Sequence, residues 1–195
     1  MEYSYFQRED YPTSCGNPSP DPVQVRDGSD VWYSGAFQIP STDFDSQGKP
    51  GNDVTFFRLE NSTSAAGALS VRTDGRVHFV TDPNLSQAGD ETELLQSGGQ
   101  NGVPIANNGC WHFYEIHQKI GAGSTTNELW LDGQKQTTVQ TPVDNYFGSP
   151  YDRYRAGIVA ASGNAPFSLW TDEVGIGYVG PLAFNMCRGV NDTLP

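Results

Sequence analysis

The sequence of 195 residues contains few cysteines, few histidines and few basic side chains, and it lacks a long apolar run. Its 11 lysine and arginine residues are outnumbered by 23 aspartate and glutamate residues, so the formal net charge is −12. A nucleic-acid backbone is bound by basic surfaces, and this balance therefore argues against a nucleic-acid partner. A membrane helix needs about 20 consecutive apolar residues. Because no stretch approaches that length, we expect no membrane insertion.

The three cysteines, Cys15, Cys110 and Cys187, do not have the spacing of metal ligands. Cys110 directly precedes a predicted strand, and we expect its thiol to be buried. The chain opens on Met-Glu-Tyr-Ser-Tyr, which has neither the basic nor the apolar segment of a signal peptide. We therefore expect the chain to be a mature or excised segment.

Glycine, proline and aromatic residues are frequent, with 22 glycines, 13 prolines and 12% aromatics. This composition is typical of many short strands joined by tight turns. Asp74-Gly75 and Asp132-Gly133 each lie between two alternating runs, and such a dipeptide is a strong hairpin signal. A helical period is absent apart from a possible short turn over 142–148. The pattern predicts an all-β, two-layered antiparallel architecture.

The predicted strands and boundaries follow from these breaks. An irregular N-terminal arm covers residues 1–30, one β domain covers 31–181 and a tail covers 182–195. The strands are expected at 31–39, 54–60, 68–72, 76–80, 91–96, 111–120, 128–132, 135–139, 154–161 and 167–178. Polar and glycine-rich loops are expected at 41–52 and 97–109.

Four runs in the second half of the chain carry a family resemblance. They are Trp111-His112-Phe113-Tyr114-Glu115-Ile116-His117, Leu129-Trp130-Leu131-Asp132-Gly133, Tyr154-Arg155-Ala156-Gly157-Ile158, and the run from Leu169 to Gly177. Their succession resembles the concanavalin A-like lectin/glucanase superfamily, in particular the laminin-G-like modules and the jelly-roll polysaccharide lyases. The resemblance implies a two-sheet antiparallel jelly-roll sandwich. It specifies the fold better than the activity.

The same resemblance implies further features. The chain ends of such sandwiches commonly lie close together, which suggests a disulfide between Cys15 and Cys187. The family often holds a structural Ca²⁺ beside the closing strand, and Asp172 occupies the matching position; carboxylate and carbonyl oxygens are the ligands that this cation prefers. Three Asn-X-Ser/Thr acceptor patterns are also present. Together these features indicate an extracellular or surface-associated location.

Catalysis by the family's mechanisms lacks a complete residue set. The related lyases often carry Tyr-x-Lys-x-Gly-x-Tyr on one strand, and here the matching run begins at Arg153. Arg155 replaces the lysine, but Val159 replaces the second tyrosine and cannot transfer a proton. The glucanase run Glu-x-Asp-x-x-Glu is absent. Glu115 and His117 share one strand face and can serve as acid and base, although solvent-facing residues show the same spacing.

The sequence therefore favours a noncatalytic carbohydrate-binding module. The candidate residues for binding a polysaccharide or glycan on the concave sheet are Trp32, Arg58, Glu60, Glu115, His117 and Arg155. A second hypothesis is a polysaccharide-cleaving enzyme, lyase-like or a glycoside hydrolase, with an altered site. A third is a structural or adhesive subunit of a virion or another extracellular assembly, whose terminal arms would join copies into a homo-oligomer.

Overall fold

The structure is a computed structural model that describes residues 25–87, 89–105, 109–136, 138, 142–162 and 168–177. Cys15, Cys187 and both terminal segments lie outside these residues. The disulfide, the two arms and the oligomer that they would form therefore stay predictions. The first described strand begins at Asp30, one residue before the predicted 31–181 domain, and the last ends at Gly177, inside it.

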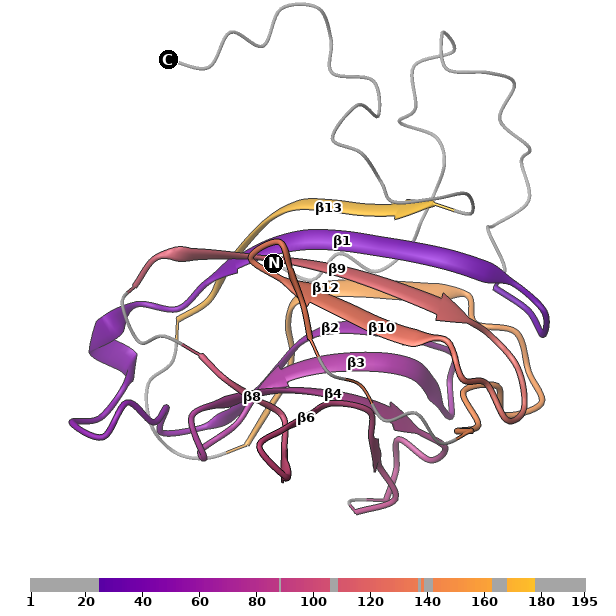
Figure 1. The fold of residues 1–195 in the computed structure, drawn as a ribbon, viewed down its shortest axis with the longest axis horizontal. Helices are drawn as coiled ribbons and strands as arrows, with labels where there is room; N and C mark the ends of the chain where they lie inside the picture. The colour runs from indigo at the N-terminus through magenta and orange to yellow at the C-terminus, as the bar shows by residue number, and fades with distance from the viewer. Residues whose placement is uncertain are drawn as a thin grey trace, which may run out of the picture.

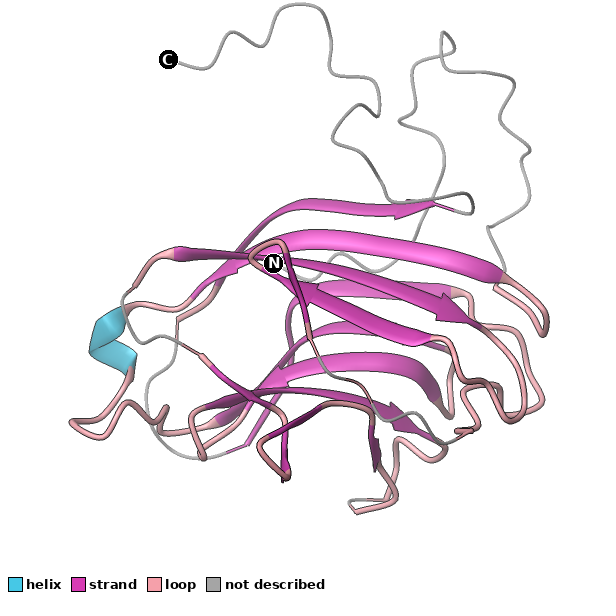
Figure 2. Ribbon diagram, viewed as in Figure 1, coloured by secondary structure: helices cyan, strands magenta, loops and turns pink. Residues whose placement is uncertain are grey.

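Thirteen strands in the described part of the chain form two main antiparallel sheets and one small ribbon (Figures 1 and 2). The first sheet has the order β11-β10-β9-β1-β13, with β1 Asp30–Gln38, β9 Trp111–Lys119, β10 Asn127–Leu131, β11 Gln134–Lys135 and β13 Trp170–Gly177. The second has the order β12-β2-β3-β4-β5, with β2 Asp53–Glu60, β3 Ala65–Val71, β4 Arg76–Asp82, β5 Thr92–Glu93 and β12 Arg153–Ser162; β8 Val103–Pro104 also pairs with β4. The ribbon joins β6 Gln96–Ser97 to β7 Gln100–Asn101. This architecture is the predicted two-sheet jelly-roll sandwich.

Both predicted Asp-Gly hairpins are present. The β3–β4 turn has Gly75 at φ 79°, and the β10–β11 turn has Asp132 at φ 51° followed by Gly133 at φ 76°. Two consecutive positive φ angles are the signature of a type I′ turn, which matches the twist of the flanking strands. The strand expected at 135–139 is shorter than predicted, since β11 comprises Gln134–Lys135 alone.

The helical turn expected at 142–148 is absent from this described segment, and that prediction was wrong. Asn145 explains why: its N–H donates to the Gly121 carbonyl (3.3 Å), and its Oδ1 accepts from the Gly121 N–H (2.8 Å). These contacts hold the segment against the loop after β9. A short 3₁₀ helix occurs instead at Ser41–Asp43. No helix within the described ranges is long and apolar enough to cross a membrane.

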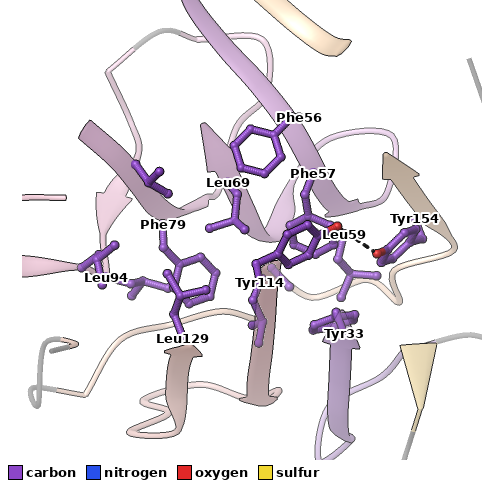
Figure 3. Packing of buried hydrophobic residues seen from close by; sticks show 14 of the residues in the cluster. Tyr33, Phe56, Phe57, Leu59, Leu69, Phe79, Leu94, Tyr114, Leu129 and Tyr154 are labelled. Atoms are coloured by element: carbon purple, nitrogen blue, oxygen red, sulfur yellow. Dashed lines mark hydrogen bonds between the residues drawn. The ribbon is translucent and has the colours of Figure 1, made fainter. Parts of the chain in front are cut away.

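The core lies between the two sheets and is rich in aromatic side chains (Figure 3). Phe37 of β1 contacts Phe56 of β2, with ring centroids 4.3 Å apart. Tyr114 of β9 and Tyr154 of β12 join the sheets through their hydroxyls, 3.4 Å apart, and burial raises the pKa of Tyr114 to about 12. Because residues alternate along each strand, the neighbours of these core residues face outward on each sheet.

Candidate functional site

The outer face of the first sheet carries five aromatic residues, which we call the aromatic face. They are Trp32 of β1, Trp111 and Phe113 of β9, Trp130 of β10 and Trp170 of β13. Along a strand, side chains alternate between the two faces, and residues paired across strands point to the same face. By these two criteria all five aromatic side chains lie on the outer side of the sheet. Three of the six predicted binding residues, Trp32, Glu115 and His117, lie on this face.

At one end of this face, the rings stack on one another. Trp32 and His117 are cross-strand partners, and their ring centroids lie 4.2 Å apart with the planes 6° from parallel. Trp130 stacks on Trp32 at 5.5 Å, and the ammonium of Lys135 lies 5.1 Å from the Trp130 ring centroid. Such contacts stabilise the pairing of β1, β9 and β10, because cross-strand aromatic and cation–π pairs each contribute about 0.5–1 kcal/mol.

Acidic groups fix the His117 ring in this stack. Its Nε2 lies 2.7 Å from Oδ1 of Asp30, and its Nδ1 lies 2.8 Å from Oε2 of Glu128. Only a protonated ring can donate from both nitrogens. Partial burial acts to raise the pKa of Glu128, but hydrogen bonds from Lys135 and His117 outweigh it, and the pKa is lowered. Both ring nitrogens of His117 are therefore already engaged.

At the other end of the aromatic face the rings are open. Trp111, Phe113 and Trp170 are 40%, 44% and 50% exposed. Gln38 of β1 lies opposite both tryptophans, and Ala36 lies opposite Phe113, so the three rings surround the end of β1. None of them has a ring–ring partner among the described residues. Grouped exposed aromatics on one face mark a surface that binds a partner or ligand.

Glu115 lies between the stacked and the open rings. It is opposite Ser34 of β1 and Trp130 of β10. Within the described part of the chain, its Oε1 is buried and has no hydrogen-bond partner, and burial raises the pKa of this carboxyl. A buried acceptor without a donor is costly.

The other three predicted residues, Arg58, Glu60 and Arg155, lie on the outer face of the second sheet. The Glu60 side chain is 4% exposed, and its oxygens lie 3.3 Å from Arg58 Nη1 and 2.9 Å from Arg155 Nε. Arg153 approaches the same carboxylate at 4.0 Å. The three arginines and Glu60 thus form a compact ion-pair cluster on one side of the sandwich.

The six predicted residues therefore do not share one sheet face, although they were predicted to lie together on the concave sheet. Alternation along a strand shows which residues share a face, but it does not show to which sheet the strand belongs. β1 and β9 are in the first sheet, whereas β2 and β12 are in the second, so the six residues divide into two sets of three on opposite faces.

Other predicted features have mixed outcomes. Cys110 is exposed, so the expectation of a buried thiol was wrong. Asn61, the first glycosylation acceptor, is buried, and its Oδ1 accepts from the backbone N–H groups of Thr63 and Ser64. Asp172 lies in β13 opposite Ala36, but its side chain is outside what the structure describes. Among the described residues, no group of three or more His, Cys, Asp or Glu side chains could hold a metal ion, and calcium at Asp172 stays a prediction.

Solved structures with similar folds have little sequence in common with this chain. The endo-β-1,4-glucuronan lyase from the fungus Trichoderma reesei has a TM-score of 0.52 and 16% identity over 80% of this chain and 71% of its own. The globular domain of T. cruzi calreticulin has a TM-score of 0.51 and 13% identity over 82% and 66%. The binding domain of botulinum neurotoxin serotype D has a TM-score of 0.50 and 14% identity over 77% and 34%.

These similarities show the jelly-roll sandwich fold that the family resemblance implied. The chain spans about a third of the length of the neurotoxin binding domain and about two thirds of the calreticulin domain. No protein-family model matches the sequence, and no curated protein matches it either.

The open rings of Trp111, Phe113 and Trp170 were not predicted as binding residues from the sequence. The signal for two of them is in the alternation along β9, where Trp111 and Phe113 share the period of Glu115 and His117. Trp170 carries no such signal, because its face depends on the pairing of β13 with β1.

Proposed function

We propose that this protein is a noncatalytic carbohydrate-binding module whose glycan lies along β9 on the aromatic face. The observation that carries the proposal is the group of open rings at Trp111, Phe113 and Trp170, which lies on the same face as the stacked rings at Trp32 and Trp130. An aromatic ring offers an apolar surface with a polar edge, which suits the apolar C–H face of a sugar ring and its hydroxyl rim. The fold is compatible with this role.

The polar groups on this face favour a neutral glycan. Asp30, Glu115 and Glu128 supply three carboxylates, while the ammonium of Lys135 is paired with Glu128 and both ring nitrogens of His117 face carboxylates. The chain as a whole is strongly acidic. A uronate or sulfate group would meet repulsion from these carboxylates, whereas the hydroxyl groups of a neutral sugar carry no opposing charge.

The same residues are poorly suited to proton transfer. His117 faces Asp30 and Glu128 rather than Glu115, so Glu115 and His117 do not form an acid–base pair. Val159, at the position of a lyase tyrosine, has no exchangeable side-chain proton. Binding without cleavage is the activity that these residues support best.

A glycan array followed by affinity measurement tests the proposal. Trp111, Phe113 and Trp170 are changed together to alanine, and Ile158→Ala is the matched control, because Ile158 is 49% exposed but lies on β12 of the second sheet. We expect the triple variant to bind a glycan hit at least tenfold more weakly and the control to bind it normally. The proposal would be contradicted if the wild-type protein bound none of the neutral glycans, or if the triple variant bound the glycan hit as tightly as wild type.

A lyase-like enzyme is the second candidate function. The arginine cluster around Glu60 favours it, because guanidinium groups are suited to uronate carboxylates. An ultraviolet assay for unsaturated products, run on uronate-containing polysaccharides, separates the two candidates. Product formation that is abolished by Arg155→Ala would favour the enzyme.

We also propose an extracellular or surface location and a structural Ca²⁺ at Asp172. The acidic balance of the chain is compatible with a cation site. Thermal unfolding with Ca²⁺ and with a chelator tests the second proposal, since a bound ion stabilises the folded state in proportion to the logarithm of its concentration. The proposal would be contradicted if Ca²⁺ did not raise the melting temperature of the wild-type protein, or if it raised that of Asp172→Asn equally.

A further inference from the structure

A cavity of about 420 Å³ lies between the two sheets at the end of the sandwich where β9 begins. The first sheet contributes residues from the end of β1, the start of β9 and the β10–β11 hairpin, and the second contributes β4 and β8. The lining residues are Phe37, Val77, Ser97, Val103, Pro104, Ile105, His112, Leu131, Asp132, Gln134 and Gln136. This volume is within the usual range of small-molecule sites, about 300–1,000 Å³.

Asp132 holds one wall of this cavity in a fixed geometry. Its Oδ1 accepts from the Phe113 N–H (2.9 Å), and its own N–H donates to the Phe113 carbonyl (2.8 Å). Its second oxygen, Oδ2, lies 2.8 Å from Nδ1 of His112. Asp132 therefore cannot turn away from His112 without breaking its contacts to β9.

This pair determines what His112 presents to the cavity. A carboxylate can only accept, so Nδ1 of His112 carries the proton and donates to Asp132. In a neutral ring Nε2 is then a hydrogen-bond acceptor. Among the described residues, Nε2 of His112 has no hydrogen-bond partner, and the ring is held by its tilted contact with Phe37 at 5.4 Å. His112 thus offers one oriented acceptor to a ligand.

The lining chemistry narrows the class of that ligand. Six of the lining residues are apolar, and Ser97, Gln134 and Gln136 add neutral groups that both donate and accept. The charged lining residue is Asp132, and neither lysine nor arginine is among the lining residues. A carboxylate or phosphate would therefore meet a like charge without a compensating cation.

We infer that this cavity binds a small neutral ring that carries hydroxyl groups, such as a single neutral sugar residue, with a ligand hydroxyl donating to Nε2 of His112. The site is separate from the aromatic face, because His112 is buried between the sheets whereas its neighbours Trp111 and Phe113 are exposed on the outer side. The inference therefore does not depend on the function proposed above.

The experiment is a nuclear magnetic resonance titration of the full chain labelled with ¹⁵N at histidine. The probes are the methyl glycosides of glucose, galactose and mannose as neutral rings, with glucuronate as the anionic comparison. The tautomer of His112 is read directly from its ring nitrogen signals. We expect the Nδ1–H form without ligand and a shift of Nε2 when a neutral glycoside is added.

Asp132→Asn is the diagnostic variant. Asparagine tolerates the positive φ of this position, and its Oδ1 can still accept from Phe113, while its NH₂ group would face Nδ1 of His112. His112 would then carry its proton on Nε2, which changes the acceptor into a donor. We expect at least tenfold weaker binding of the glycoside. Asp152→Asn, which alters an exposed aspartate that contacts Arg153 on the second sheet, is the control and should leave the His112 shifts unchanged.

Each outcome decides the inference. A saturable shift of His112 with a neutral glycoside, lost in Asp132→Asn and kept in Asp152→Asn, supports it. Absence of any His112 shift in the wild-type protein with all three glycosides overturns it, and this measurement does not require the variant to fold. Stronger binding of glucuronate than of the neutral probes would overturn the charge argument.

Discussion

The outer faces of the two sheets differ in how completely their side chains are satisfied. On the second sheet, Glu60 lies beneath three arginines and all the described contacts of its carboxylate are ion pairs within the cluster. On the first sheet, Trp111, Phe113 and Trp170 leave about half of their surface open, and the buried Oε1 of Glu115 has no donor among the described residues. A face whose groups satisfy one another contributes to stability, whereas the open rings are the surface that we propose binds a glycan.

Removing Glu60 should have the largest effect on stability. Glu60→Ala would leave Arg58, Arg153 and Arg155 close together without their shared carboxylate. Removing one partner of a buried pair costs about 3–5 kcal/mol, and because the arginines are 18–25% exposed we expect the lower end of that range. Urea unfolding measures the change in the free energy of unfolding.

Asp152→Asn is the control for this prediction. Asp152 contacts Arg153 at 3.3 Å, but its side chain is 51% exposed, and an exposed ion pair contributes about 0–1 kcal/mol. If Asp152→Asn destabilised the protein as much as Glu60→Ala, the contrast between a satisfied cluster and an ordinary surface pair would be lost.

Within the aromatic face, Trp32→Ala and Trp170→Ala separate a stacked ring from an open one. Trp32→Ala loses the stacking on His117 and Trp130, and we expect a loss of about 1–2 kcal/mol. Trp170→Ala removes a half-exposed ring, and surface changes usually cost less than about 0.5 kcal/mol. Thermal unfolding of both variants at one pH checks the difference, and the reverse order would contradict our division of this face.

The pH dependence of Glu128→Gln provides a smaller effect. Because the folded-state pKa of Glu128 is lowered, its ionised form stabilises the fold above the ordinary carboxyl pKa of about 4.3, and this contribution is lost as the pH falls through the lowered pKa. Wild type should be more stable than Glu128→Gln near pH 7, and the two should converge in acid. Urea unfolding over a pH series measures the gap; a gap that is constant with pH would exclude linkage to Glu128.

Glu115→Gln should give the smallest change, with the opposite sign. Burial raises the folded-state pKa of Glu115, so the wild-type protein gains stability as the pH falls from neutrality through that raised pKa. The neutral glutamine should therefore make the protein slightly more stable than wild type near pH 7, and the gain should vanish below about pH 4.3. The same pH series of unfolding curves provides the measurement, and a variant less stable at pH 7 would contradict it.

The sequence predicted the sandwich because its signals are local. Asp74-Gly75 and Asp132-Gly133 require positive φ angles that few other dipeptides accept, and alternation separated core residues such as Tyr114 from outward-facing neighbours such as Glu115. These signals act within one hairpin or one strand.

The candidate site was harder to predict because it depends on which strands become neighbours. Arg58 and His117 both face outward on their strands, yet the two strands belong to opposite sheets. The opening of Trp170 toward solvent depends on its pairing with Gln38, which is distant in the chain. The cavity at His112 likewise requires the β10–β11 hairpin and β8 to meet, and nothing in either segment alone indicates the other.

The position of β1 in the first sheet has a consequence for the order of folding. β2, β3 and β4 are consecutive and pair as a meander, whereas β1 pairs with β9 and β13, which follow much later in the chain. Closing long loops delays such contacts, and folding slows as contacting residues become more separated in sequence. β12 likewise pairs with β2 from far along the chain. We therefore expect the β2–β3–β4 meander to form before β1 joins β9 and β13 and before β12 joins β2, so that the aromatic face is assembled only in the last steps of folding.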